Sequence, residues 1–119
     1  MLPDPAAFAN QWVEEWNSRD LDRILAHYAP HVVFRSPIAA RVVPGSQGVV
    51  RGIDQLRHYW GTALSQAPDL RFELLDVCAG VSTLLIRFRN QLGAVRCEVL
   101  RFEGGLVVEG EGTDLVELA

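Results

Sequence analysis

The 119-residue sequence contains no lysine, so all eleven of its basic residues are arginine. This absence excludes Schiff-base chemistry, pyridoxal-phosphate attachment and a Walker-type phosphate loop, because each of these needs a lysine amine. Fifteen acidic residues outnumber the eleven arginines and give a net charge of −4. Since the arginines also form no basic run, we expect no nucleic-acid partner.

Cysteine and histidine are scarce as well. Cys78 and Cys97 lack the density of a disulfide scaffold and the spacing of a zinc site, so we interpret them as reduced thiols. His27 and His31 have the spacing of a helical metal pair, but Pro30 lies between them and ends the helix. We therefore expect neither a metal nor a cofactor.

Long apolar runs are missing too. The first residues show no basic segment followed by an apolar one, so they do not resemble a signal peptide. No apolar run approaches the length of a membrane span. We expect a soluble, cytoplasmic protein with no membrane partner.

Apolar residues are plentiful, at 49% of the chain. A chain of 119 residues is shorter than the length at which one hydrophobic core divides into two. We therefore predict a single domain over residues 1–119.

Helical signals come first along the chain and strand signals follow. Asp4 and Pro5 predict a helix through about residue 17, Asp20 caps a second short helix that Pro30 ends, and a third begins near Ile53. Residues 36–52 are rich in Pro and Gly and are interpreted as a loop, in which the segment from Gly45 to Gly48 is expected to be a mobile flap bordering a pocket. Strands are predicted at 31–35, 69–79, 81–90, 93–103 and 106–114. Because the last four strands are joined by short turns, they should be antiparallel, and the helices should cover one face of a curved sheet in an α+β fold.

The strand at 95–102 has two apolar faces. One face carries Val95, Cys97, Val99 and Arg101, and the other carries Arg96, Glu98, Leu100 and Phe102. The face with Glu98 should pack under the helices. We expect the face with Val99 to pack against a second copy of the chain, forming a homodimer.

Several short segments resemble the nuclear-transport-factor-2-like superfamily, in its SnoaL-like and ketosteroid-isomerase-like branch. These are WNSRDLD at 16–22, YAPHVVF at 28–34, SP at 36–37, Gly52, PDLRF at 68–72 and LRFEGG at 100–105. The resemblance implies a cystatin-like α+β barrel, in which a cone-shaped, curved antiparallel sheet is wrapped around three N-terminal helices. It also implies an apolar pocket at the open end and dimerisation through the sheet. This fold hosts enzymes and binding modules alike.

The isomerase branch implies a carboxylate base, a tyrosine and a protonated acid. By motif these positions fall at Ser36, Trp12 and Glu98, so only the acid is kept. Serine does not remove a carbon-bound proton without a base beside it, and indole is a weaker acid than phenol. We therefore expect no ketosteroid isomerase activity. The limonene-epoxide-hydrolase branch needs an Asp-Arg-Asp cage around a water molecule. The position of the final acid of that cage falls near Gly112 here, so the resemblance does not favour this branch.

Glu98 is the best candidate for a catalytic residue. Arg96 shares its strand face, so the two form either a pocket acid tuned by a guanidinium or a structural ion pair. If loss of hydration dominates, the pKa of Glu98 is raised. Gly110 and Gly112 should point inward and widen the cavity. The residues expected to line the pocket are Trp12, Trp16, Phe34, Ser36, Tyr59, Trp60, Arg96, Gly110, Gly112 and Asp114.

Two function hypotheses follow from these observations. The first is a SnoaL-like pocket protein that acts on a small apolar, carbonyl-bearing substrate by general acid–base chemistry, as an isomerase or cyclase would. The second is a non-catalytic module for ligand binding or dimerisation. The first needs a pocket acid with a perturbed pKa, whereas the second needs only the apolar cavity.

Overall fold

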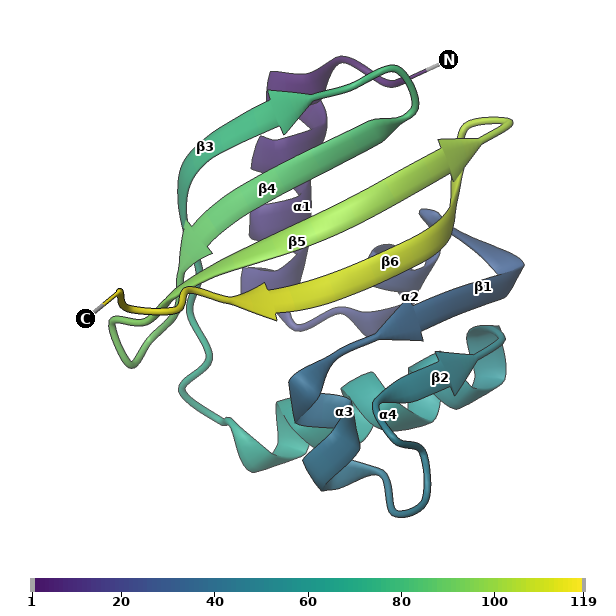
Figure 1. Cartoon of the computed structure of the whole chain (residues 1–119), viewed down its shortest axis with the longest axis vertical. Coiled ribbons are helices and arrows are strands. Elements are labelled where there is room, and N and C mark those ends of the chain that lie inside the picture. Colours follow the sequence, from purple (N-terminus) through teal and green to yellow (C-terminus); the bar gives the residue numbers. More distant parts are fainter. Residues whose placement is uncertain (1, 119) are drawn as a thin grey trace.

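Six strands form one curved sheet, and the helices lie against one of its faces (Figure 1). The structure is a computed structural model and describes residues 2–118. Its elements are α1 (Pro5–Ser18), α2 (Leu21–Leu25), β1 (Tyr28–Arg35), α3 (Pro37–Val42), β2 (Val49–Arg51), α4 (Ile53–Gln66), β3 (Glu73–Ala79), β4 (Thr83–Arg89), β5 (Val95–Glu103) and β6 (Leu106–Asp114). The predicted α+β class is confirmed.

The strand order is β2-β1-β6-β5-β4-β3. Strands β3 to β6 form the predicted antiparallel meander. One pairing departs from the expected antiparallel sheet, because β1 runs parallel to β6. The rule that short turns give antiparallel neighbours does not apply to two strands separated by most of the chain. The edge strands β2 and β3 do not pair with each other, so the sheet is curved but unclosed.

The segment expected to be a loop, 36–52, contains two further elements. The Ser36 Oγ accepts a hydrogen bond from the backbone N–H of Ile38 at 3.1 Å, and Pro37 occupies the first turn, so α3 has both start signals of a helix. Strand β2 pairs antiparallel with β1. Residues 2–118 therefore contain four helices rather than the expected three. The element α3 has six residues and β2 has three, which is too short for either to show a clear hydrophobic period.

Strand β1 starts earlier than predicted. Tyr28 belongs to β1 and not to the second helix, which ends at Leu25. Pro30 lies within the strand, where the pairing with β6 is irregular between Tyr28 and Val33. A proline is tolerated at such an irregularity because its missing N–H breaks no regular ladder bond.

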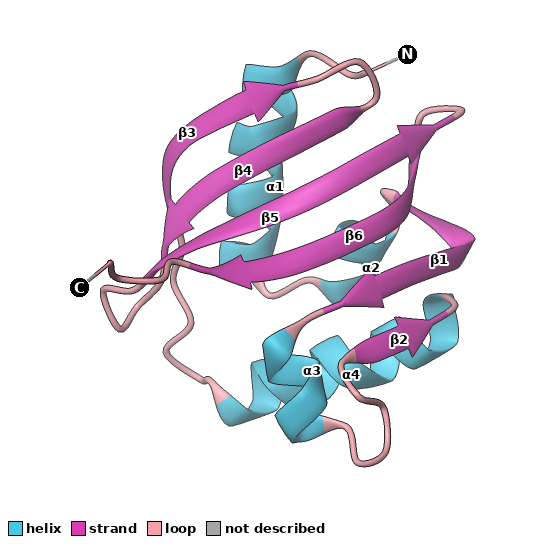
Figure 2. Cartoon of the chain, viewed as in Figure 1, coloured by secondary structure: helices cyan, strands magenta, loops and turns pink. Residues whose placement is uncertain are grey.

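The sheet face under the helices is the one predicted from alternation. In β5 the side chains of Glu98, Leu100 and Phe102 are buried, whereas Val99 on the other face is half-buried. Helix α1 lies behind β3, β4 and β5, and α4 lies behind β1 and β2 (Figure 2). None of the described helices is both long and apolar enough to cross a membrane.

Two side chains of the WNSRDLD segment hold the turn between α4 and β3. The Asn17 amide donates to the carbonyl of Phe72 at 2.9 Å and accepts from the Phe72 N–H at 2.7 Å. Arg19 donates to the carbonyls of Ala67, at 2.9 Å, and Leu64. These bonds fix the end of α1 to the segment that leads from α4 into β3.

Replacing Asn17 by alanine should lower the free energy of unfolding by about 2 kcal/mol, because both backbone groups of Phe72 lose their partner. Urea denaturation measures this change. The matched control is Asn10→Ala on the same helix, since Asn10 is exposed and bonds only within α1. We expect the control to change stability by less than about 0.5 kcal/mol. Equal stability of the two variants would contradict the role of Asn17.

Candidate ligand-binding cavity

A cavity of about 240 Å³ lies between α1, α3, α4 and the inner face of the sheet. Seven of its nineteen lining residues are aromatic. The aromatic lining residues are Trp12, Trp16, Phe34, Tyr59, Trp60, Phe72 and Phe88. Trp60 packs edge-on against both Trp16 and Phe34, with ring centroids 5.0 and 5.2 Å apart. Such a wall favours a flat, apolar ligand.

Polar side chains form one part of the cavity wall. Glu98 and Arg96 come from β5, and Gly112 of β6 lies directly across from Glu98. A Cβ atom at Gly112 would lie 3.2 Å from Arg96 Nη2, 3.4 Å from Ser36 Oγ and 3.5 Å from Glu98 Oε2. Three polar atoms therefore converge over a residue that has no side chain.

Ser36 is both the cap of α3 and part of this polar wall. Its Oγ also accepts a hydrogen bond from the Tyr59 hydroxyl at 3.4 Å. Burial raises the pKa of Tyr59, so its hydroxyl stays protonated and remains a donor. Ser36 has no histidine hydrogen-bonded to it, so it lacks the partner that activates a serine nucleophile.

Glu98 is the carboxyl of the cavity. Burial raises its pKa to about 7, and the nearby positive charge of Arg96 only partly opposes this. The close partner of Arg96 is Asp114, with Nε and Oδ1 2.7 Å apart. Of the two alternatives for Glu98 and Arg96, the geometry therefore supports a desolvated pocket acid. Glu98 can change protonation state near neutral pH.

Nine of the eleven predicted site residues line the cavity. They are Trp12, Trp16, Phe34, Ser36, Tyr59, Trp60, Arg96, Glu98 and Gly112. That they bind a ligand stays a prediction.

Gly110 and Asp114 lie outside the cavity. A Cβ at Gly110 would lie 2.8 Å from a ring carbon of Phe34, so this glycine makes room for an aromatic ring and does not widen the cavity. The Asp114 side chain is half exposed and holds Arg96 from the end of β6.

Sequence reasoning missed the lining residues of α3 and two aromatic residues, one just before β3 and one in β4. Ile38 and Val42 lie in the segment that was interpreted as a loop. Phe72 and Phe88 carried an available signal, since both are aromatic residues in or beside predicted strands. Trp12 stacks on Phe72 at 5.8 Å, which brings Phe72 into the same wall.

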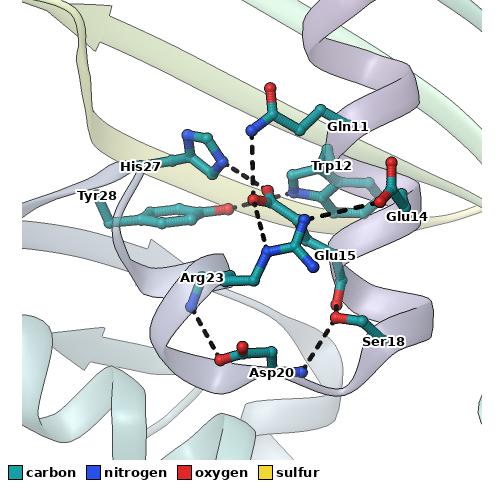
Figure 3. A network of polar contacts seen from close by, with 9 residues as sticks. All are labelled: Gln11, Trp12, Glu14, Glu15, Ser18, Asp20, Arg23, His27 and Tyr28. Carbon is teal, nitrogen blue, oxygen red and sulfur yellow. Dashed lines mark hydrogen bonds and ion pairs between the residues drawn. The ribbon is translucent and has the colours of Figure 1, made fainter.

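A second polar cluster surrounds the buried Glu15 and joins α1 to α2 and to the turn that leads into β1 (Figure 3). The Glu15 carboxylate is buried, with Oε1 2.6 Å from His27 Nε2 and Oε2 3.8 Å from Arg23 Nε. Gln11 donates to the same carboxylate at 3.3 Å. This Glu15 cluster lies outside the cavity, and it holds α1 against α2 and the turn before β1. Among residues 2–118 no group of three or more His, Cys, Asp or Glu is placed to hold a metal ion.

Trp12 and Tyr28 lie between the two buried carboxyls. The Trp12 Nε1 donates to the Tyr28 hydroxyl at 3.4 Å. Burial, and then the charges of Glu98 and Glu15, raise the pKa of Tyr28 far above its ordinary value. The Tyr28 phenol is therefore neutral at all physiological pH values. The indole of Trp12 is also committed to Tyr28, which makes it a poor oxyanion donor for a ligand.

The family model for the SnoaL-like domain matches residues 9–110. The chain belongs to the SnoaL-like domain family. The resemblance to the nuclear-transport-factor-2-like superfamily is thereby confirmed. A sequence comparison with curated proteins finds no match for this SnoaL-like chain.

Solved structures with this fold are numerous. A SnoaL-like protein of unknown function from Burkholderia thailandensis is 34% identical, with a TM-score of 0.88 and 94% of each chain covered. TerC, co-crystallised with polyporic acid, is 13% identical with a TM-score of 0.76, covering 94% of this chain and 92% of TerC. A protein with a cystatin-like fold from Methylobium petroleophilum is 19% identical with a TM-score of 0.71, covering 98% of this chain and 80% of the other. The last two likenesses concern the fold alone.

Proposed function

We propose that this SnoaL-like protein binds a small, largely apolar molecule bearing a carbonyl group, and that Glu98 acts on it as a general acid–base. The carrying observation is a single carboxyl with a pKa of about 7 in an aromatic cavity. A base that ionises near the working pH transfers protons most effectively. Isomerisation and cyclisation of carbonyl compounds both begin with such a transfer.

The proposed step removes a proton from the carbon next to the carbonyl. The C–H electron pair forms the enolate, the proton goes to the Glu98 carboxylate, and Arg96 stabilises the negative charge on the oxygen. Glu98 then returns the proton to another carbon. Ser36 and Trp12 replace the base and tyrosine of ketosteroid isomerases, so this proposal does not extend to steroid isomerisation. The co-crystal of TerC with polyporic acid supports a small organic ligand for a protein of this fold.

The alternative is a ligand-binding module without catalysis. This alternative is favoured because Ser36 and Trp12 stand at the base and tyrosine positions of the isomerases. It needs only the aromatic part of the cavity wall. Deuterium exchange distinguishes the two functions.

The experiment follows α-deuteration of 1-tetralone in D2O by NMR. Catalysis predicts an exchange rate at least tenfold above background that increases as pH rises through about 7, because Glu98 must be ionised to accept a proton. Glu98→Gln should reduce the rate to background. The matched control is Glu15→Gln, a second buried carboxyl outside the cavity, and it should retain the exchange. Binding of 1-tetralone without exchange would favour the alternative, and absence of both would contradict the proposal.

A further inference from the structure

We propose that Arg96, Glu98 and Ser36 form a subsite for a single hydroxyl oxygen of the ligand, and that Gly112 keeps this hydroxyl subsite open. The ligand class is therefore a flat aromatic or enolic molecule with a hydroxyl on its edge. This inference rests on the proposed function, because it assumes that the cavity takes an apolar ligand.

Two buried hydrogen-bond donors beside the cavity have no acceptor within residues 2–118. Among the described residues, only two buried side-chain nitrogen or oxygen atoms lack a hydrogen-bond partner, namely Trp16 Nε1 and Arg96 Nη2. Both residues line the cavity. A buried N–H without an acceptor is costly, so native structures rarely keep one without a reason. A ligand oxygen supplies the missing acceptor.

The contact of Arg96 with Asp114 shows which guanidinium nitrogen is available to a ligand. Its Nε is bound to Asp114 Oδ1 at 2.7 Å, and this bond fixes the guanidinium at the end of β5. The Nη2 atom lies on the side of Gly112, Ser36 and Glu98. Arginine only donates hydrogen bonds, so the group that it receives must be an acceptor.

Gly112 is glycine for a reason other than backbone conformation. It lies in the regular pairing of β5 and β6 and is not among the glycines with a positive φ. The missing side chain lets Arg96 Nη2, Ser36 Oγ and Glu98 Oε2 approach one another over the strand, since these atoms lie 3.2 to 3.5 Å from the position of a Cβ. A methyl group there would press against Arg96 Nη2 and displace the polar atoms that form the subsite.

The two charged partners select a hydroxyl. When Glu98 is ionised, one side of the subsite donates from Arg96 and the other accepts at Glu98. A hydroxyl matches both, because it accepts from Arg96 and donates to Glu98. A methyl group of similar size matches neither.

The test uses two probes that differ in this group alone, 2-naphthol and 2-methylnaphthalene. Dissociation constants are measured at pH 8 by NMR titration of the 15N-labelled protein, with the indole N–H signals as reporters. We expect the wild-type protein to bind 2-naphthol at least tenfold more tightly. In Gly112→Ala this preference should fall below twofold, while the dissociation constant of 2-methylnaphthalene changes less than threefold.

Two further variants complete the test. Arg96→Met should also abolish the preference, so the proposal remains testable if the Gly112 variant folds poorly. Gly61→Ala is the matched control, because it adds a methyl group on α4 only 3.7 Å from Leu21, in ordinary contact, and should keep the preference. Equal binding of the two probes to the wild-type protein, or a preference that survives in Gly112→Ala, overturns the subsite. If neither probe binds the wild-type protein, the proposed function itself fails.

Discussion

Glu98→Gln should be more stable than the wild-type protein above pH 7, by roughly 3 kcal/mol, and equally stable near pH 4. Burial raises the folded-state pKa of Glu98 from 4.5 to about 7. Between these values the folded protein keeps a proton that the unfolded chain has released. The wild-type protein therefore loses stability as pH rises from 4.5 to 7, and this loss is complete above 7. Glutamine has the shape of the neutral acid but never ionises, so the variant escapes the loss.

Urea denaturation of both proteins at pH 4, 5.5 and 8 measures the effect. The difference between the two free energies of unfolding isolates Glu98 from the other carboxyl groups. The matched control is Glu109→Gln, because Arg101 lowers the pKa of Glu109 and the variant should gain no stability at pH 8. A difference between Glu98→Gln and wild type that is the same at pH 4 and pH 8 would show that Glu98 is hydrated in the folded protein.

Val99→Glu should convert a homodimer into monomers. We propose that the chain dimerises through the outer face of the sheet, where Val95, Cys97 and Val99 follow one another along β5 and, with Leu85 across from Val99, form a half-buried apolar centre. Ion pairs border this centre, with Asp76 paired to Arg87 and Arg101 paired to Glu109. An apolar centre with a polar rim is typical of protein interfaces. A carboxylate placed in the centre would lose its hydration without gaining a partner.

Sedimentation velocity at micromolar concentration measures the state of each protein. Circular dichroism shows whether the Val99 variant keeps its fold. The control Val81→Glu changes an exposed valine in the turn between β3 and β4, at 98% exposure, and should remain dimeric. A wild-type protein that sediments as a monomer would remove the basis for the proposed dimer.

Most of the fold was predictable because its signals are local. Asp4 accepts the N–H of Ala7 at 2.9 Å as the cap of α1, and Asp20 accepts from Arg23 at 3.2 Å at the start of α2, as the sequence indicated. The parallel pairing of β1 with β6 was not predictable in the same way. It depends on which distant strand completes the sheet, and no local pattern specifies that.

In the candidate site, too, local signals predict some features and long-range packing decides the others. Helical spacing places Trp12 and Trp16 on one face, and strand alternation places Glu98 inside. Gly110 and Gly112 share a strand face and look alike in sequence, but a ring of Phe34 fills the space above one, and polar atoms converge over the other. Only the three-dimensional packing distinguishes the two glycines.

The central position of β6 has a consequence for the order in which the protein assembles. This strand is the last of those in residues 2–118, but it joins β2 and β1 on one side to β5, β4 and β3 on the other. During synthesis the N-terminal segments leave the ribosome first. Until β6 follows, no strand joins β1 to β5, and Glu98 has no Gly112 across from it. The polar wall of the cavity is thus completed only after β6 has been made.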